Sequence, residues 1–125
     1  MKKIFTIIAT VFALSSFTTP TSLTNVVNAI KSGNAASVSK YFDNTVEITI
    51  NGKSTNYSKA QGELVLRDFF AINNVKAFSI LHQGESGGAE FCIGTLATSN
   101  GIYRCTLNLK KKADKQTLQE IKFEK

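Results

Sequence analysis

The sequence predicts an α+β fold in which N-terminal helices pack on a mostly antiparallel sheet. Apolar residues recur at helical spacing early in the chain, polar and apolar residues alternate later, and two Asn-Gly pairs mark hairpin turns. A length of 125 residues allows one domain and is too short for a TIM barrel or a two-domain dehydrogenase. One histidine and two cysteines are too few for a zinc site, so we expect no metal and no cofactor.

Residues 1–20 have the pattern of a secretory signal peptide. Lys2 and Lys3 form a positive start, and residues 4–17 are uncharged, mostly apolar and short for a membrane span. No Ala-x-Ala triplet fixes the cleavage site, so we expect the mature chain to begin near residues 16–23. The protein is therefore expected to be periplasmic or secreted, with one domain over residues 21–125 and no membrane span after processing. An uncleaved membrane anchor is the alternative.

Two helices are predicted before the sheet. The first has a cap at Ser22, a stop at Gly33 and apolar residues at i, i+3, i+4 and i+7: Leu23, Val26, Val27 and Ile30. A second, short helix is expected over residues 35–42. Alternation over residues 46–50 then predicts a strand, and Asn51-Gly52 is a hairpin turn to a return strand over residues 53–57.

The third helix has the clearest signals. Ser58 and Gln61 have the spacing of a capping box, in which each side chain bonds a free backbone N–H at the helix start. Glu63 and Arg67 form an i, i+4 pair on another face, and Asn73 ends the helix. One apolar stripe is expected to face the core: Gly62, Val65, Leu66, Phe69 and Phe70.

Four strands are predicted in the second half of the chain, over residues 76–83, 89–98, 102–110 and 117–123. If Asn100-Gly101 is a two-residue turn, Ser99 pairs with Ile102. The inner face of this hairpin is then apolar and the outer face is mixed. The outer face carries Phe91, Ile93, Thr95, Ala97, Arg104, Thr106, Asn108 and Lys110.

Both cysteines fall on the inner face of this hairpin. In the expected register Cys92 lies opposite Leu109 and Cys105 opposite Leu96, which separates the two cysteines by about 13 Å at strand rise. A disulfide needs Cα atoms within about 7 Å. We therefore interpret the cysteines as small buried core residues. A four-residue loop would shift the register, make them diagonal neighbours and leave a bridge as the alternative.

Several short motifs resemble a family of small secreted bacterial domains of unknown function. They are Tyr57-Ser58-x-x-Gln61, Val65-Leu66-x-Asp68-Phe69-Phe70, His82-x-Gly84 and Gly94-x-Leu96-x-Thr98-Ser99-Asn100-Gly101-x-Tyr103-Arg104. Helices followed by a long antiparallel sheet also resemble the nuclear-transport-factor-2-like superfamily, the cystatin-like α+β cone. The resemblance covers the chain from Leu23 onward. It implies a curved, cone-shaped sheet and an exported location, and it supplies no reaction.

Four side chains are candidates for a pocket in the cone: Tyr41, Asp68, His82 and Tyr103. Histidine is the side-chain type whose unperturbed pKa lies near neutrality, and His82 would need an orienting carboxylate to act as a general base. Ketosteroid isomerase, which has this cone fold, uses a tyrosine and a protonated aspartate as an oxyanion hole, so Asp68 is the aspartate to inspect. The spacing does not match that enzyme, and we assign no catalytic residue. The simpler interpretation makes both His82 and Asp68 solvated surface residues.

Charged and apolar residues on the surface suggest two kinds of partner. Five lysines make the C-terminal part basic: Lys110, Lys111, Lys112, Lys115 and Lys122. They attract acidic surfaces, polysaccharide or lipid head groups, or they solvate a turn and protect a sheet edge. No aromatic residues interleave with them, so nucleic acid is not an expected partner. Four outer-face residues are candidates for a homodimer contact unless a strand or loop covers them: Phe91, Ile93, Arg104 and Thr106.

These observations favour an exported, non-catalytic binding protein that uses a concave pocket or a sheet face for a small molecule or an envelope partner. One alternative is an isomerase- or dehydratase-type enzyme that uses His82 or Asp68 in the cone. Another is a protein-interaction or structural module of the envelope. Because one fold hosts all three classes, the site must decide among them. A titratable cluster on a pocket floor would favour the enzyme, and a filled cone would favour the interaction module.

Overall fold

The computed structural model describes residues 22–125, and the predicted signal peptide lies outside these described residues. The elements in chain order are α2 (Ser22–Lys31), α3 (Ala35–Ser39), β1 (Phe42–Ile50), β2 (Lys53–Ser58), α4 (Lys59–Ile72), β3 (Val75–Ser86), β4 (Ala89–Thr98), β5 (Gly101–Lys112) and β6 (Lys115–Glu124). Within residues 22–125, no helix is long and apolar enough to cross a membrane.

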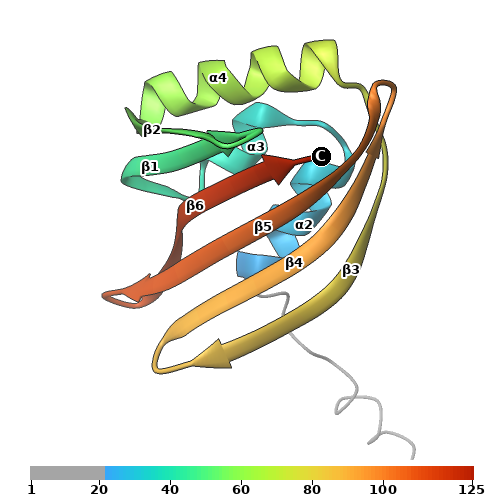
Figure 1. Ribbon diagram of the computed structural model, residues 1–125. Coiled ribbons are helices and arrows are strands. Elements are labelled where there is room, and N and C mark those ends of the chain that lie inside the picture. Colours follow the sequence, from blue (N-terminus) through green and yellow to red (C-terminus); the bar gives the residue numbers. More distant parts are fainter. Residues whose placement is uncertain (1–21) are drawn as a thin grey trace, which may run out of the picture.

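The six strands form one curved sheet in the order β2-β1-β6-β5-β4-β3, with the helices on its inner face (Figure 1). All neighbouring strands are antiparallel except β1 and β6, which pair in parallel. Apolar residues at alternate strand positions point toward the helices, which is the condition for burying one face of a sheet. The predicted α+β architecture is confirmed.

Aromatic rings fill the centre of the cone. The Phe69 ring on α4 stacks on Phe123 of β6 with centroids 4.1 Å apart, and it meets the Tyr103 ring edge-on at 5.2 Å. Gly62 brings α4 close to β1, because a Cβ atom there would lie 2.8 Å from Cγ1 of Val46. The interior is therefore closely packed around these residues.

The helix signals correspond to the structure in part: Ser58 caps α4, whereas Ser22, predicted as a cap, is the first residue of α2. Ser58 Oγ accepts the Gln61 N–H at 3.2 Å, and Arg67 pairs with Glu63 at 2.6 Å, as the pattern of the third helix predicts. The second helix is shorter than predicted, because α3 ends at Ser39 and the strand begins at Phe42. The cause is a long-range contact, since the carbonyl of Tyr41 accepts the N–H of Leu118 on β6.

The predicted register of the β4–β5 hairpin is wrong by two residues. Thr98 lies opposite Gly101, so Ser99 and Asn100 form the turn. The hydroxyl of Thr98 closes this turn, because it donates to Gly101 O at 2.7 Å and accepts the Asn100 N–H at 3.1 Å. A shift of two residues keeps each side chain on its predicted face.

The new register brings the two cysteines closer together than expected. Cys92 lies opposite Leu107 and Cys105 opposite Gly94, so the cysteines are diagonal neighbours on the inner face. Both are fully buried free thiols. Burial raises the pKa of Cys92 and of Cys105, and the neighbouring Cys92 raises that of Cys105 further. Diagonal Cα atoms lie about 7–8 Å apart, beyond normal disulfide reach, which agrees with the free thiols.

Candidate functional site

An apolar cleft runs between the C-terminal half of α4 and the ends of β1 and β5; we call it the α4 cleft. Its volume is about 300 Å³. That volume is at the lower limit of clefts that bind small molecules. The lining residues are Ile50, Val65, Asp68, Phe69, Ile72, Asn73 and Tyr103.

The polar groups on the floor of the α4 cleft bond one another. Tyr103 donates its hydroxyl proton to Asn73 Oδ1 at 3.1 Å, and Asn73 Nδ2 donates to Phe69 O at 3.0 Å. Asn100 Nδ2 donates to Ile72 O at 2.8 Å and to Asn73 Oδ1 at 3.3 Å. This network closes the end of α4 and ties it to the β4–β5 turn. The Tyr103 proton is therefore engaged, as a buried hydroxyl requires.

The walls of the α4 cleft are apolar and accessible. Ile72 is 67% exposed, while Ile50 and Val65 are half-buried against the core. Asp68 lies exposed on the rim, one helical turn before Ile72. The ammonium of Lys125 lies 5.2 Å from the centroid of the Tyr103 ring. The cleft thus combines apolar walls, an aromatic floor and one carboxylate at its edge.

The structure divides the four predicted pocket residues among three places. Asp68 and Tyr103 share the α4 cleft. Tyr41 precedes β1 and lies at the opposite end of that strand, in a separate hollow. His82 is exposed on the edge strand β3, where its ring centroid lies 5.3 Å from that of Phe91. Within residues 22–125 no carboxylate makes a hydrogen bond or ion pair with His82, so the orientation expected of a general base is missing.

The outer face of the sheet is less exposed than the sequence suggests. The Phe91 ring lies against the backbone of Gly84 on β3, where a Cβ atom would stand 2.7 Å from Phe91 Cε1. Phe91, Ile93 and Thr106 are half-buried, and Arg104 is exposed. The neighbouring strand β3 therefore covers part of the Phe91 ring within one chain.

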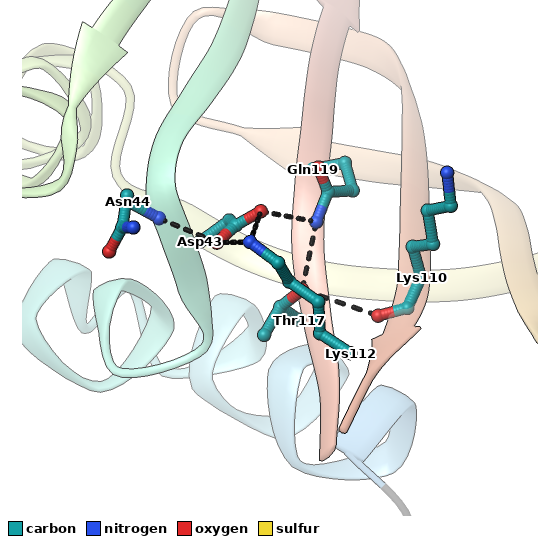
Figure 2. Close-up of polar contacts among 6 residues, drawn as sticks. All are labelled: Asp43, Asn44, Lys110, Lys112, Thr117 and Gln119. Atoms are coloured by element: carbon teal, nitrogen blue, oxygen red, sulfur yellow. Dashed lines mark hydrogen bonds and ion pairs between the residues drawn. The ribbon is translucent and has the colours of Figure 1, made fainter. Parts of the chain in front are cut away.

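A charged cluster fixes the β5–β6 hairpin to the start of β1 (Figure 2). Lys112 Nζ lies 3.0 and 3.1 Å from the two carboxylate oxygens of Asp43, and Gln119 Nε2 donates to Oδ2 at 3.1 Å. Gln119 also donates to Thr117 Oγ1 at 2.8 Å. The hydrogen bonds from Lys112, Gln119 and the Asn44 backbone lower the pKa of Asp43 to about 2.

The residues that the structure describes form no group of three or more histidine, cysteine, aspartate or glutamate side chains that could hold a metal ion. Sequence reasoning missed Asn73 as the partner of Tyr103 and Asn100 as the partner of Asn73. Their signals were present, since one asparagine ends a helix and the other belongs to a turn. Nothing in the sequence shows that these two positions meet.

Three solved structures illustrate the similarity to known proteins. A protein of Bacteroides ovatus, described as a member of the DUF4783 family, is 36% identical, with a TM-score of 0.79 over 81% of this chain and 92% of that one. A nuclear-transport-factor-2-like protein of unknown function from Shewanella oneidensis is 15% identical, with a TM-score of 0.64 over 83% and 93%. A hypothetical protein from Catenulispora acidiphila with a ketosteroid isomerase-like fold, in complex with trimethylamine, is 13% identical, with a TM-score of 0.65 over 86% and 87%.

A search of curated proteins finds no match. The model of a domain of unknown function, DUF4783, matches residues 23–124, which is nearly all of the described chain. The fold is that of the nuclear-transport-factor-2-like superfamily, as the sequence motifs and the curved sheet indicate. The chain belongs to the DUF4783 family.

Proposed function

We propose that this protein is an exported, non-catalytic binding protein whose α4 cleft holds a small, largely apolar ligand. The main support is that the polar groups on the floor of the cleft are already bonded, whereas its apolar walls are exposed. The floor amides and the Tyr103 hydroxyl bond one another, whereas the apolar wall residue Ile72 is 67% exposed. Burying such surface is the main source of affinity for a small ligand.

One feature of the cleft favours a positive charge on the ligand. Asp68 lies on the rim, and the faces of aromatic rings attract cations. The Lys125 ammonium already lies over the Tyr103 ring, 5.2 Å from its centroid. The Catenulispora acidiphila protein of similar fold is described in complex with trimethylamine, a small amine with apolar substituents. A small organic cation with apolar groups therefore suits the α4 cleft.

The geometry gives less support to an enzyme. A proton-transfer site needs an acid or base within hydrogen-bond reach of the substrate and a second group that orients it. The Tyr103 hydroxyl bonds Asn73, and His82 lies on the far side of the sheet from the cleft. Two residues that line the cleft have ionisable side chains, Tyr103 and Asp68. One exposed carboxylate binds a cation more readily than it abstracts a proton.

The proposal is tested by titrating isotope-labelled protein with choline and with its neutral analogue 3,3-dimethylbutan-1-ol. Both should shift the NMR signals of Val65, Ile72 and Asn73, and choline should bind more tightly. Ile72→Ser should weaken binding of both, and Asp68→Asn should remove the preference for choline. Leu64→Ser is the matched control, since Leu64 is 55% exposed on the same helix and lies outside the cleft.

Two results would contradict this proposal. One is a titration in which neither compound shifts the signals of cleft residues. The other is equal weakening by Leu64→Ser and Ile72→Ser, which would indicate unspecific contact with the helix. Export is a separate part of the proposal. N-terminal sequencing of protein from the envelope fraction should begin near residues 16–23, and an intact Met1 on a cytoplasmic pool would exclude it.

A further inference from the structure

A second hollow lies where the starts of α2, α4 and β6 meet, at the end of the molecule opposite the α4 cleft; we call it the lysine hollow. Its volume is about 260 Å³. Three of its lining residues are lysines from separate elements: Lys40, Lys59 and Lys115. Its other lining residues are Ser22, Tyr41, Phe42, Gln116 and Thr117. It contains no residue of the α4 cleft, so an inference about it goes beyond the proposed function.

The three lysines of the hollow are not neutralised. Within residues 22–125 the ion pairs are Arg67 with Glu63 and Lys112 with Asp43, and neither uses a lysine of the hollow. No aspartate or glutamate lines the hollow. Three lysines with no carboxylate among them line one concave surface, an arrangement that an anion would complement. The hollow therefore has the electrostatic character of an anion site.

Groups without a net charge also favour an anion in the hollow. The first residues of α2 and α4, Ser22 and Lys59, both line the hollow, and neither helix has an acidic residue in its first turn. The start of a helix carries a partial positive charge that extends over about one turn. The hydroxyls of Ser22 and Tyr41 are further donors that line the hollow. Ammonium and hydroxyl donors together suit the several oxygens of a phosphate group.

The frame of the lysine hollow is fixed before any ligand binds. The N–H of Leu118 bonds the carbonyl of Tyr41, which joins the start of β6 to the segment before β1. Next to it, Asp43 holds Lys112 and Gln119, and Gln119 holds Thr117 (Figure 2). A fixed frame reduces the entropy lost on binding. The volume equals roughly nine waters at ~30 Å³ each, which suits a phosphate with a short polyol.

We propose that the lysine hollow binds the phosphate ester of a small polyol, the chemistry of glycerol phosphate. Two sources share this chemistry. One is a soluble polyol phosphate, and the other is the headgroup of a lipid such as phosphatidylglycerol, in which the phosphate is a diester. The lysine hollow and the α4 cleft share no lining residue, so either proposal can fail without the other.

The direct test is a calorimetric titration with glycerol 3-phosphate at constant ionic strength, with chloride and glycerol as references. Lys40→Gln/Lys59→Gln should weaken binding at least about tenfold, because each charge-assisted bond contributes roughly that factor. The matched control is Lys53→Gln/Lys76→Gln, which removes two exposed lysines on the edge strands β2 and β3 that do not line the hollow. The control should change binding less than about twofold, as expected for distant charges screened by salt.

A single substitution at the exposed turn, Lys115→Gln, keeps the test valid if the double variant of the hollow folds poorly. It should weaken binding of glycerol 3-phosphate several-fold without lowering the melting temperature. Binding of glycerol 3-phosphate no stronger than that of chloride would overturn the proposal. Equal weakening by the control variant would also overturn it, because the attraction would then be a property of the whole basic chain.

Vesicles distinguish the two sources of the ligand. The protein should co-sediment with phosphatidylcholine vesicles that contain phosphatidylglycerol if a lipid headgroup is the ligand, and the hollow variant should lose this binding while the control keeps it. Binding of glycerol 3-phosphate without binding to vesicles would assign a soluble ligand and support the proposal equally. Binding to anionic vesicles that both double variants reduce alike, with no binding of glycerol 3-phosphate, would overturn it.

Discussion

The two ends of β5 are tied to other elements of the fold by different chemistry: one end to the end of α4, the other to the start of β1. At its start, Tyr103 joins Asn73 and Asn100 in a network of neutral groups, two of which are buried. At its other end, Lys112 pairs with Asp43 at a partly solvated surface, where Lys112 is 57% exposed. Figure 1 shows these ends on opposite sides of the molecule, beside the end of α4 and beside the start of β1.

The difference between these ends shows how burial determines the contribution of a polar contact to stability. A buried hydroxyl that loses its partner cannot turn to water, so its loss is costly. An exposed lysine that loses its partner is hydrated at once, and salt screens the pair while it exists. The neutral end is therefore expected to contribute more to stability than the charged end.

The largest effect is expected in the aromatic core beneath the neutral end. Phe69→Ala removes a ring that is 5% exposed and stacked on Phe123. Such truncations cost about 3–5 kcal/mol of unfolding free energy. Thermal melting should show a fall of roughly 15 °C or more. Leu64→Ala on the exposed side of α4 is the control and should melt within a few degrees of the wild type; similar melting of both variants would contradict the assigned helix orientation.

A smaller loss is expected from Asn73→Ala, which leaves the buried Tyr103 hydroxyl without its acceptor. The cost should be about 1–3 kcal/mol in denaturant unfolding. Adding Tyr103→Phe should recover part of the lost unfolding free energy, because no buried hydroxyl then lacks an acceptor. Asn74→Ala is the control, since Asn74 is exposed and its backbone makes the bonds to Ser99. Independent, additive effects of Asn73→Ala and Tyr103→Phe would show that the bond contributes nothing.

At the charged end, Asp43→Asn should cost only about 0.5–1 kcal/mol, and the cost should depend on pH. The folded pKa of Asp43, about 2, lies below the ordinary aspartate pKa of 3.8. The carboxylate therefore stabilises the fold fully above the unfolded value, and this contribution is lost as the pH falls through the folded value. Unfolding in urea along a pH series should show wild type and variant converging near pH 2.

Two comparisons make this pH prediction specific. Added salt should reduce the difference between wild type and Asp43→Asn at neutral pH. Asp114→Asn, at the exposed turn of the same hairpin, should show little difference at any pH. A cost of Asp43→Asn that persists unchanged to acid pH would mean that shape, and not charge, fixes this end of the hairpin.

The smallest change in stability, about 0.5 kcal/mol, is expected from Ile93→Lys on the outer face between the two ends, because the stem of lysine can cover the same surface. We propose that this half-buried residue contributes to a homodimer with Phe91, Arg104 and Thr106. A two-fold contact uses the same patch twice, so one substitution should dissociate it. Light scattering at micromolar concentration should show a dimer for the wild type and a monomer for the variant.

The control for the dimer is Ile80→Lys, an exposed isoleucine that shares the inner side of β3 with Phe78. It should leave association unchanged. A monomeric wild type would remove the outer-face dimer, and so would a dimer that Ile93→Lys leaves intact.

Local signals explain what could be predicted from the sequence. The cap at Ser58, the Asn51-Gly52 turn and the apolar stripe of α4 each depend on residues within one or two turns of chain. The bounds of β4 follow from its alternation and its flanking turns. Such signals determine which elements form, and their order then indicates the α+β class.

The remaining features depend on contacts between distant residues. The register of β4 and β5 follows from one side chain, Thr98, whose hydroxyl selects the earlier of two turns. The bond between Tyr103 and Asn73 spans 30 positions in the chain. The lysine hollow gathers side chains from the α3–β1 segment, α4 and β6, whereas the sequence shows only the run of lysines near the C-terminus. No local pattern indicates that these groups meet.

The reactivity of the two buried thiols can report how often the folded protein opens. Cys92 and Cys105 lie on adjacent central strands, fully buried, and a buried thiol with a raised pKa reacts very slowly with alkylating reagents. Alkylation therefore requires an opening that exposes the inner face of β4 and β5. The chain has no tryptophan, so fluorescence offers no comparable signal. Mass spectrometry of labelled cysteine over time would follow unfolding under native conditions, without denaturant and without any engineered reporter.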